Sequence, residues 1–357
     1  MIVISLDGVK DTVFEYLAHN PATCPNIAEF KSRANYIGGV KTIFVSNTYP
    51  IHTTISTGRL PREHGIISNL INEEKNIWAQ DAVLIKSKTI WQAAKEKGLS
   101  VATILWPVTC SAKIKYNLPE VHLTAGQNQI IENFKNGSAL FQIKAFLKHG
   151  KKMKGLEPIC LDDFTSSVAA DLLNKQKPDL TLIHLLAYDF TSHDYGSKSE
   201  EVKLACKSLD QSVGKILAAA GGQTVLMFSD HGHFDVDEVV NLKSIYKEEL
   251  YEQCGGSAFF SKLPKDIELQ PWFERFLTAE EMETSGYSKY AAGGIAAKVD
   301  YCFAKGNYKS NHGYPADYPD YNVFYAVAGA KRTYNPIYND VRDITVIIDK
   351  ELNLGLL

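Results

Sequence analysis

The sequence predicts an α/β fold with a mostly parallel central sheet and helices on both faces. Short apolar segments alternate along the chain with amphipathic segments. Several of the apolar segments are continuous runs, which is typical of strands buried on both faces of a parallel sheet. Two stretches interrupt this alternation: 111–160, which is polar and mixed, and 235–311, which is aromatic and irregular.

Six short apolar runs, most of them rich in β-branched residues, are predicted as strands. In chain order they are Ile2–Leu6, Val40–Val45, Val101–Leu105, Leu180–Leu186, Thr224–Ser229 and Ile344–Ile348. Four amphipathic segments between them are predicted as helices. These are Pro25–Arg33, Thr89–Lys97, Ser166–Lys175 and Glu200–Ala219. The succession of strand, helix and strand favours parallel pairing.

The two interruptions suggest how the chain is organised. Neither has the composition of a clean linker, so we interpret both as insertions on the sheet rather than as sheet units. We expect a catalytic core formed by 1–234 and 312–357, with a variable insertion near 111–160. The segment 235–311 is expected to form a small cap or lid, whose aromatic residues would make its own core.

Composition and charge exclude several classes of protein. The 357 residues include 38 Lys and Arg against 41 Asp and Glu, a net charge of -3, and 45% are hydrophobic. This is ordinary globular composition, which excludes disorder and coiled coil as the main state. The charge gives no electrostatic case for a nucleic acid polymer as the partner.

The sequence also bears on the compartment. No apolar run approaches the roughly 18 residues that a membrane span needs. The first residues, MIVISLDGV, lead directly into a predicted strand and lack the features of a secretory signal. The six cysteines show no CxxC or zinc-ribbon spacing, which indicates reduced, buried thiols. We therefore expect a cytoplasmic protein, and the oligomeric state stays open.

Polar residues follow several predicted strands, where ligands of α/β sheets bind. The candidates are Asp7, Thr48, Asp189 with His193, the pair Asp230 and His231, and His312. Each alone is compatible with a turn or a helix cap. Together, three Asp and three His with a Thr among them converge on one edge of the sheet. Such nitrogen and oxygen ligands without cysteine suit two zinc-like ions, which at about 3.5–4 Å apart can clamp a displacement at phosphorus.

The order and wording of these motifs resemble one known family. The motifs are Asp7-Gly8, Thr48-Tyr-Pro-x-His, Thr57-Gly58-x-x-Pro61-x-x-His64-Gly65-Ile66-x-x-Asn69, Asp189-x-x-x-His193, Ser229-Asp230-His231-Gly232 and Asn311-His312-Gly313-Tyr314. They are similar to those of the type I phosphodiesterase/nucleotide pyrophosphatase family, a member of the alkaline phosphatase superfamily. The resemblance extends from residue 1 to about 330, and it implies an alkaline-phosphatase-like fold.

The resemblance also implies a role for each matching residue. Asp189, His193 and His312 would hold one zinc ion, and Asp7, Asp230 and His231 would hold the other together with the hydroxyl of Thr48. Thr48 would be the nucleophile and would form a phospho-threonine intermediate, at the N-terminus of a helix through residues 52–57. Asn69 would donate to a phosphoryl oxygen alongside the backbone N–H near Thr48. The implied substrate is a small phosphodiester or a nucleotide.

Alternatives remain open on the same metal site. A phosphomonoesterase would need a further cation, and no arginine stands clearly beside the motifs. A carbon–phosphorus hydrolase of the phosphonoacetate type would rest mainly on Lys113 as a substrate contact, with Lys115. A binding protein with an inactive site is disfavoured, because all seven positions are filled.

Three further histidines are interpreted as structural or peripheral. His52 is expected to pack or cap near the nucleophile, and His64 to support its loop. His233, two residues after His231, is expected to face solvent.

Overall fold

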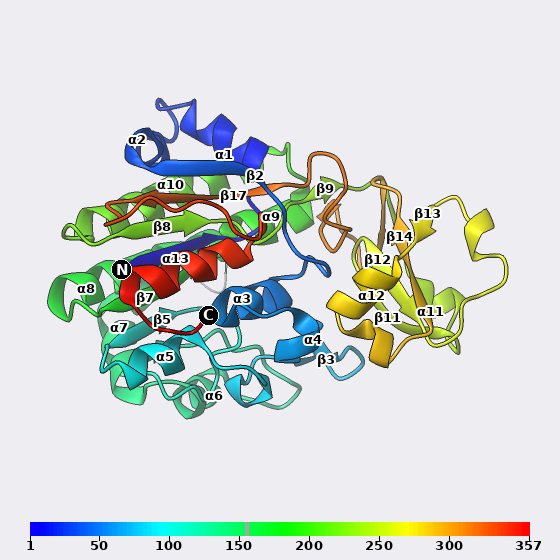
Figure 1. Cartoon of the computed structure of the whole chain (residues 1–357), viewed down its shortest axis with the longest axis horizontal. Coiled ribbons are helices and arrows are strands. Elements are labelled where there is room, and N and C mark those ends of the chain that lie inside the picture. Colours follow the sequence, from blue (N-terminus) through cyan, green and yellow to red (C-terminus); the bar gives the residue numbers. More distant parts are fainter. Residues whose placement is uncertain (154–156) are drawn as a thin grey trace.

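The computed structural model describes residues 1–153 and 157–357, and its main body is built on a seven-stranded sheet (Figure 1). Residues 154–156, part of the predicted insertion 111–160, lie outside the described residues. The strand order is β2 (Asn35–Val40), β17 (Val323–Ala328), β8 (Val225–Phe228), β1 (Ile2–Leu6), β7 (Leu180–Leu185), β5 (Val101–Ile104) and β6 (Tyr116–Leu118). β17 pairs antiparallel with both β2 and β8, and the other four strand pairs of this sheet are parallel, so the predicted mostly parallel sheet is confirmed.

Helices cover both faces of the sheet, as predicted (Figure 1). Because strand side chains alternate between faces, Ile2 and Ile4 of β1 belong to one apolar cluster, whereas Val3 belongs to the other. The first cluster is closed by α1 (Asp11–Ala18), α2 (Pro25–Arg33), α8 (Pro158–Lys175) and α10 (Glu200–Ala219). The second is closed by α3 (Thr48–Thr57), α5 (Ile90–Glu96) and α13 (Arg342–Leu352).

The remaining elements are short or lie at the periphery of the sheet. They are α4 (Pro61–His64), α6 (Gln129–Asn136), α7 (Ala139–His149), α9 (Ala187–Tyr195), α11 (Leu242–Ile245), α12 (Ala279–Thr284), β3 (Leu70–Asn72), β4 (Ile77–Trp78), β9 (Phe234–Asp235), β10 (Glu238–Val240), β11 (Leu250–Cys254), β12 (Ser257–Phe260), β13 (Phe273–Phe276), β14 (Gly293–Ala297), β15 (Tyr301–Phe303) and β16 (Ser310–Asn311). Among the described helices, none is both long enough and apolar enough to cross a bilayer.

The predicted strand Val40–Val45 is wrong, because the strand β2 ends at Val40. The residues after it instead form a buried connection over the end of β8, where the Thr42 hydroxyl donates to the carbonyl of Asp230 at 2.7 Å. The real strand contains two glycines and lies at the sheet edge, so its apolar pattern is weak.

The predicted strand Ile344–Ile348 is also wrong, because these residues lie inside α13. Their β-branched character indicated a strand, but Ile344, Ile347 and Ile348 have helical spacing and pack in the second apolar cluster. Tertiary packing therefore outweighs local propensity here. The last strand of the sheet is instead β17, a continuous apolar run that the prediction missed.

The start of α13 depends on one buried carboxylate. The backbone N–H groups of Ile337, Tyr338 and Asn339 all donate to Asp343, at 2.8–2.9 Å. Asp343→Ala is expected to lower the free energy of unfolding by about 2 kcal/mol, since three donors lose a charged acceptor. Chemical denaturation would measure this, with Asp343→Asn, which keeps one oxygen, as the milder control. An alanine variant as stable as the parent would contradict this account of the helix start.

The two predicted insertions differ in their relation to the central sheet. The segment 111–160 is not wholly an insertion on the sheet, because β6 lies within it and extends the sheet beside β5. This strand was missed because it has only three residues and sits at the edge. The segment 235–311 instead contains a separate four-stranded sheet of order β11-β12-β14-β13, which forms the lobe at the right of Figure 1. Phe259, Phe260 and Trp272 are buried in an apolar cluster that also includes Phe44 and Tyr314 from outside this segment, so the lobe shares its core with the main body.

Candidate metal centre and nucleophile

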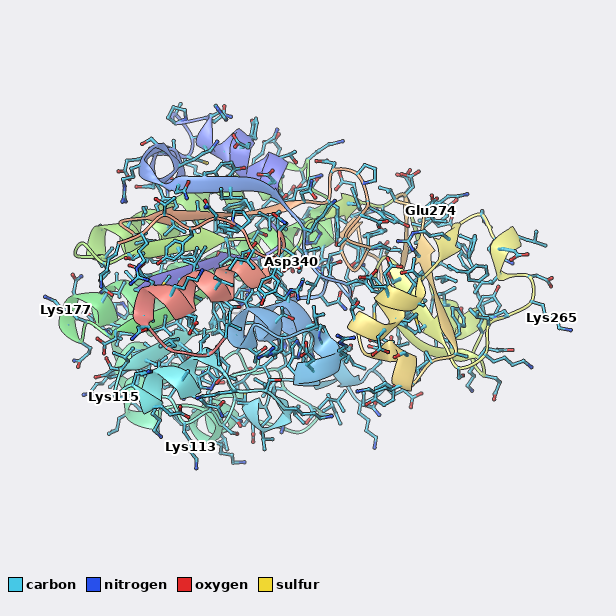
Figure 2. The ribbon with its side chains drawn as sticks, viewed as in Figure 1. Lys113, Lys115, Lys177, Lys265, Glu274 and Asp340 are labelled. Atoms are coloured by element: carbon cyan, nitrogen blue, oxygen red, sulfur yellow. The ribbon has the colours of Figure 1, made fainter. Side chains whose placement is uncertain are left out.

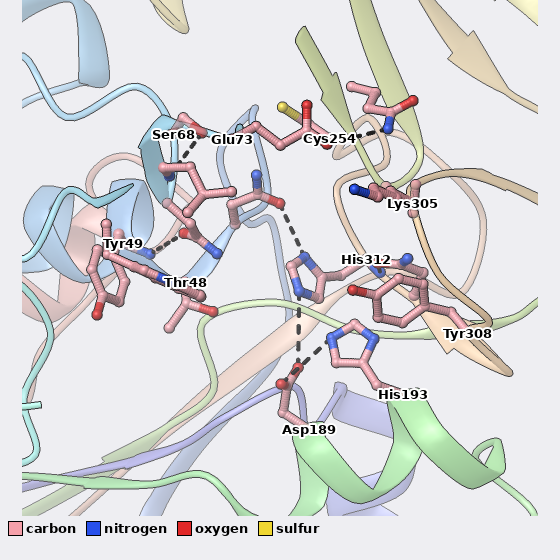
Figure 3. A pocket seen from close by; sticks show the side chains of 18 of the residues that line it. Thr48, Tyr49, Ser68, Glu73, Asp189, His193, Cys254, Lys305, Tyr308 and His312 are labelled. Carbon is pink, nitrogen blue, oxygen red and sulfur yellow. Dashed lines mark hydrogen bonds and ion pairs between the residues drawn. The ribbon is translucent and has the colours of Figure 1, made fainter. Parts of the chain in front are cut away.

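All seven predicted metal-site residues lie together at the carboxyl edge of the central sheet. Asp7 follows β1, Asp230 and His231 follow β8, and His312 follows β16. Thr48 begins α3, while Asp189 and His193 stand one turn apart on α9, so both face the same side of that helix. The close-up in Figure 3 shows Thr48, Asp189, His193 and His312 around one pocket.

One group that could hold a metal ion consists of Asp189, His193 and His312, whose ligand atoms lie within 4.8 Å of one another. The Nε2 atoms of His193 and His312 lie 3.6 and 4.0 Å from Asp189 oxygens. Each ring is fixed through its other nitrogen: His193 Nδ1 bonds the carbonyl of Ser310, and His312 Nδ1 that of Ser46. Such backbone partners orient metal-binding histidines.

A second group consists of Asp7, Asp230 and His231. His231 Nε2 lies 3.3 Å from Asp7 Oδ1 and 3.3 Å from Asp230 Oδ2. Both carboxylate oxygens are buried and have no hydrogen-bond partner among the described residues. Buried carboxylate oxygens left in this way are costly unless a cation compensates them, so the residues present fit a metal ion.

The carboxylates of the two groups influence one another strongly. Burial, together with the charges of Asp230 and Asp189, raises the pKa of Asp7 well above its usual value. Burial also opposes ionisation of Asp189, but the neighbouring His193 and His233 outweigh it and hold the pKa of Asp189 well below its usual value. Burial would also raise the pKa of Asp230, but the neighbouring His231 and His52 outweigh burial and lower it. The three buried carboxylates therefore lie close enough to repel one another, and a bound cation would relieve that repulsion.

Thr48 lies at the start of α3, as expected, with its Oγ1 3.3 Å from His231 Nε2. The helix runs through residues 52–57 as predicted and begins at Thr48. Asn69 lines the same pocket, which has a volume of about 610 Å³. Its Oδ1 accepts the backbone N–H of Tyr49 at 2.9 Å, and its amide nitrogen has no hydrogen-bond partner among the described residues. The N–H of Tyr49 is therefore engaged in holding Asn69.

His52 and His64 have the structural positions predicted for them. His52 is fully buried between the carbonyl of Thr48 at 2.8 Å and the hydroxyl of Ser5 at 2.9 Å. Burial lowers the pKa of His52 to about 3, so it is neutral at pH 7. His64 contacts the Thr54 hydroxyl at 3.0 Å and accepts the N–H of Ile66 at 3.1 Å.

The prediction that His233 faces solvent is wrong, because its side chain is only 2% exposed. Its Nε2 lies 2.6 Å from Asp189 Oδ1, and its Nδ1 accepts the hydroxyl of Ser310 at 2.9 Å. Two ligands of one tetrahedral zinc ion would stand about 3.3 Å apart, so the shorter distance indicates a hydrogen bond that orients Asp189. The ring lies against Gly8, where an added Cβ would come within 2.8 Å of it.

Replacing His233 by glutamine is expected to weaken metal binding about 10- to 100-fold, because Asp189 loses the donor that aims it. Competition with a chromogenic chelator would measure the metal affinity independently of turnover. His19→Gln, on an exposed ring, is the matched control. Unchanged metal affinity in the His233 variant would mean that the contact does not position Asp189.

Sequence reasoning missed several residues of the pocket or site, among them His184, Glu120 and His122. His184 Nε2 lies 2.9 Å from Asp7 Oδ2, but it sits in the middle of an apolar strand and no motif marks it. Glu120 and His122 line the pocket from the segment taken as an insertion, and His122 stacks on Trp78 at 3.7 Å. No signal in the sequence pointed to Glu120 or His122, since the chain that carries them does not follow a predicted strand.

Lys113, predicted as a substrate contact, does not line the pocket. It is exposed beside Trp91 and Lys95 in a separate hollow, and Figure 2 shows it at the periphery. Lys305, from the end of the predicted cap segment, lines the pocket instead (Figure 3). Its place a few residues before the Asn311-His312 motif is the sequence signal that could have found it.

Comparison with known proteins gives a consistent assignment. The sequence model of the family described as type I phosphodiesterase/nucleotide pyrophosphatase matches residues 1–316. Venom phosphodiesterase 2 of Crotalus adamanteus is 24% identical over 246 residues, which cover 65% of this chain and 26% of the venom protein. Human ectonucleotide pyrophosphatase/phosphodiesterase family member 1 is 25% identical over 250 residues, covering 65% and 23% of the two chains. The chain thus matches about a quarter of the length of these relatives.

Solved structures show the same fold at low sequence identity. Phosphonoacetate hydrolase from Sinorhizobium meliloti 1021, in complex with phosphonoformate, superposes with a TM-score of 0.73 at 15% identity, covering 98% of this chain and 95% of the hydrolase. Murine ectonucleotide pyrophosphatase/phosphodiesterase 5, an inactive variant in complex with AMP, gives a TM-score of 0.69 at 17% identity, covering 100% and 96%.

Proposed function

The chain belongs to the type I phosphodiesterase/nucleotide pyrophosphatase family, and from this premise we propose that it is a metal-dependent phosphodiesterase with Thr48 as its nucleophile. The observation that carries the proposal is the position of the Thr48 hydroxyl. It stands at the first residue of a helix, 3.3 Å from His231 of one metal-binding group, and it lines the same pocket as the other group. A helix N-terminus favours an anionic phosphoryl group.

The two groups of ligands would each hold one divalent ion, and the absence of cysteine from both suits zinc. Asp189, His193 and His312 would hold one ion, and Asp7, Asp230 and His231 with the Thr48 hydroxyl would hold the other. When bound, these ions would lower the pKa of the attacking hydroxyl and neutralise charge on the phosphoryl oxygens. Metal identity and number are part of the proposal.

The reaction would proceed in two displacements. In the first, Thr48 Oγ1 loses its proton to solvent and bonds to phosphorus, while the bond from phosphorus to the leaving oxygen breaks and that oxygen departs as an anion or takes a proton from solvent. In the second, a water oxygen bonds to the phosphorus of the phospho-threonine, the bond from phosphorus to Thr48 Oγ1 breaks, and Thr48 Oγ1 regains the proton that the water loses. The free amide nitrogen of Asn69 would donate to a phosphoryl oxygen in both steps, because Tyr49 holds its carbonyl end.

The pocket supports a small diester or a nucleotide as the substrate. Tyr49 and Trp78 give it an aromatic wall, with ring centroids 5.4 Å apart. Lys305 is the one lysine or arginine that lines it within the described part of the chain. A phosphomonoester would carry an additional charge and would call for more cationic partners. The phosphonoacetate alternative loses the lysine on which it rested, since Lys113 lies elsewhere.

Initial rates on three substrates would test this proposal. The zinc-loaded protein would be given p-nitrophenyl phosphate, a nucleotide p-nitrophenyl phosphodiester and phosphonoacetate in parallel. We expect the diester to be preferred by kcat/KM at least about tenfold, which corresponds to about 1.4 kcal/mol in transition-state binding. A clear preference for the monoester or the phosphonate would overturn the proposed substrate class while leaving the metal site to be tested separately.

A cytoplasmic location remains part of the proposal. All six cysteines are free, and five of them are buried, which suits a reducing compartment. Fractionation of cells that express the tagged native protein would test it, and recovery from the extracytoplasmic fraction would contradict it.

A further inference from the structure

The helix α7 presents large apolar side chains to solvent. Leu140 is 75% exposed, Ile143 40% and Leu147 83%. Their spacing of three and four residues places all three on one face of the helix. The opposite face of α7 is anchored to the body through the buried Gln142 and Ala145. The outward stripe therefore has no covering partner among the described residues.

The chain around α7 is strongly basic. Between residues 133 and 153 the sequence has five lysines and neither Asp nor Glu, although the net charge of the whole chain is -3. Lys144 lies one turn after Leu140 and Lys148 one turn later, so these lysines border the apolar stripe. Both of these side chains are exposed. We call Leu140, Ile143, Leu147, Lys144 and Lys148 the α7 face.

Acidic residues of neighbouring elements neutralise only part of this charge. Asp171 of α8 pairs with Lys148 and Lys175, and Asp163 of the same helix pairs with Lys152. Neither Lys144 nor Lys151 forms an ion pair within residues 1–153 and 157–357. The α7 face thus keeps a net positive edge beside its apolar stripe.

We propose that the α7 face docks this protein on an anionic lipid bilayer. A helix with an exposed apolar stripe bordered by lysines is the arrangement with which peripheral proteins bind the interface of such membranes. Each lysine near the surface gains from the negative potential, while the leucines enter the headgroup boundary. The attachment would be peripheral, since no described helix can cross a bilayer.

The combination of charge and apolar area distinguishes this partner from others. In a symmetric pair of chains the α7 faces would bring Lys144 and Lys148 of both copies together, which like-charge repulsion opposes. A nucleic acid would use the lysines but would leave the leucines in water. Figure 1 shows α7 at the end of the body remote from the lobe formed by residues 250–297, so docking would leave that lobe free.

Vesicle co-sedimentation tests the proposal without reference to catalysis. The full-length protein would be mixed with vesicles of phosphatidylcholine alone, or with about 30% phosphatidylglycerol added. We expect binding to the anionic vesicles only, weakened at high salt. Leu140→Ser with Leu147→Ser, and separately Lys144→Glu with Lys148→Glu, should each reduce the partition coefficient about tenfold or more. Leu269→Ser, at a leucine that is 77% exposed on the other lobe, is the matched control.

Several outcomes would overturn the proposal. The proposal fails if the parent protein does not bind anionic vesicles, or if it binds vesicles of both compositions equally. It also fails if the double variants bind as well as the parent. Light scattering would be run on the same samples. If the parent protein is a dimer and the double serine variant is a monomer, the α7 face would instead bind a second copy of the chain. Circular dichroism would show that each variant is folded, so that lost binding reports on the face itself.

Discussion

Thr48→Ala is expected to reduce phosphodiester hydrolysis by at least about 10⁴-fold, because it removes the hydroxyl that lies 3.3 Å from His231 Nε2 at the candidate metal site. Tyr49, Ser68 and Tyr308 also bring hydroxyls to the pocket. Among the described residues, however, the Thr48 hydroxyl is the one that contacts His231 Nε2. Steady-state rates on a nucleotide p-nitrophenyl diester would measure the loss. The backbone of α3 should be unchanged, since alanine is a good helix former.

The matched control for this prediction is Thr48→Ser, which keeps the oxygen and removes only a methyl group. It is expected to retain a measurable fraction of the rate and to form a phospho-enzyme that acid quenching traps. A Thr48→Ala protein that keeps more than a few per cent of the parent rate would show that water attacks phosphorus directly. The two proposed metal sites would be unaffected by that result, but the proposed phospho-threonine intermediate would be wrong.

The sequence predicted four of the five interior strands of the central sheet, missing β17, and neither of its edge strands, β2 and β6. β1, β5, β7 and β8 are continuous apolar runs because both of their faces are covered, and that pattern is visible without a structure. The edge strand β2 has two glycines and exposed residues, so local pattern does not define it. At Ile344–Ile348 a strand was predicted where there is none, because the β-branched residues there pack on the buried face of the helix α13.

The site was predictable where its residues follow strands. Parallel strands deliver their carboxyl ends to one edge, so Asp7 and Asp230 could be placed together from the sequence alone. The role of His233 could not be predicted in this way. Its ring lies against Gly8 and contacts Asp189, and this contact depends on the tertiary arrangement of the loops after the strands. Lys113 was wrongly predicted for a related reason: it lies near a motif in the sequence, but the fold places it in a separate hollow away from the pocket.

Removing the metal ions with a chelator is expected to abolish hydrolysis and to lower the melting temperature by several degrees. The physical reason is the charge of the site: Asp7, Asp189 and Asp230 are all buried, and Asp7 Oδ1 and Asp230 Oδ2 have no protein hydrogen-bond partner in the described chain. A ligand that binds only the folded state at about 100 times its Kd adds about 2.7 kcal/mol of stability. Calorimetry of metal-loaded and metal-free protein would measure it.

Variants of single ligands separate the two groups in the same experiment. Asp230→Asn should leave Asp189, His193 and His312 complete, so elemental analysis is expected to find one ion per chain instead of two. Asp189→Asn should empty the other group in the same way, and both variants should lose at least about 100-fold in rate. Equal melting temperatures with and without metal would contradict the argument, because the protein's own histidines would then suffice to compensate the three buried carboxylates.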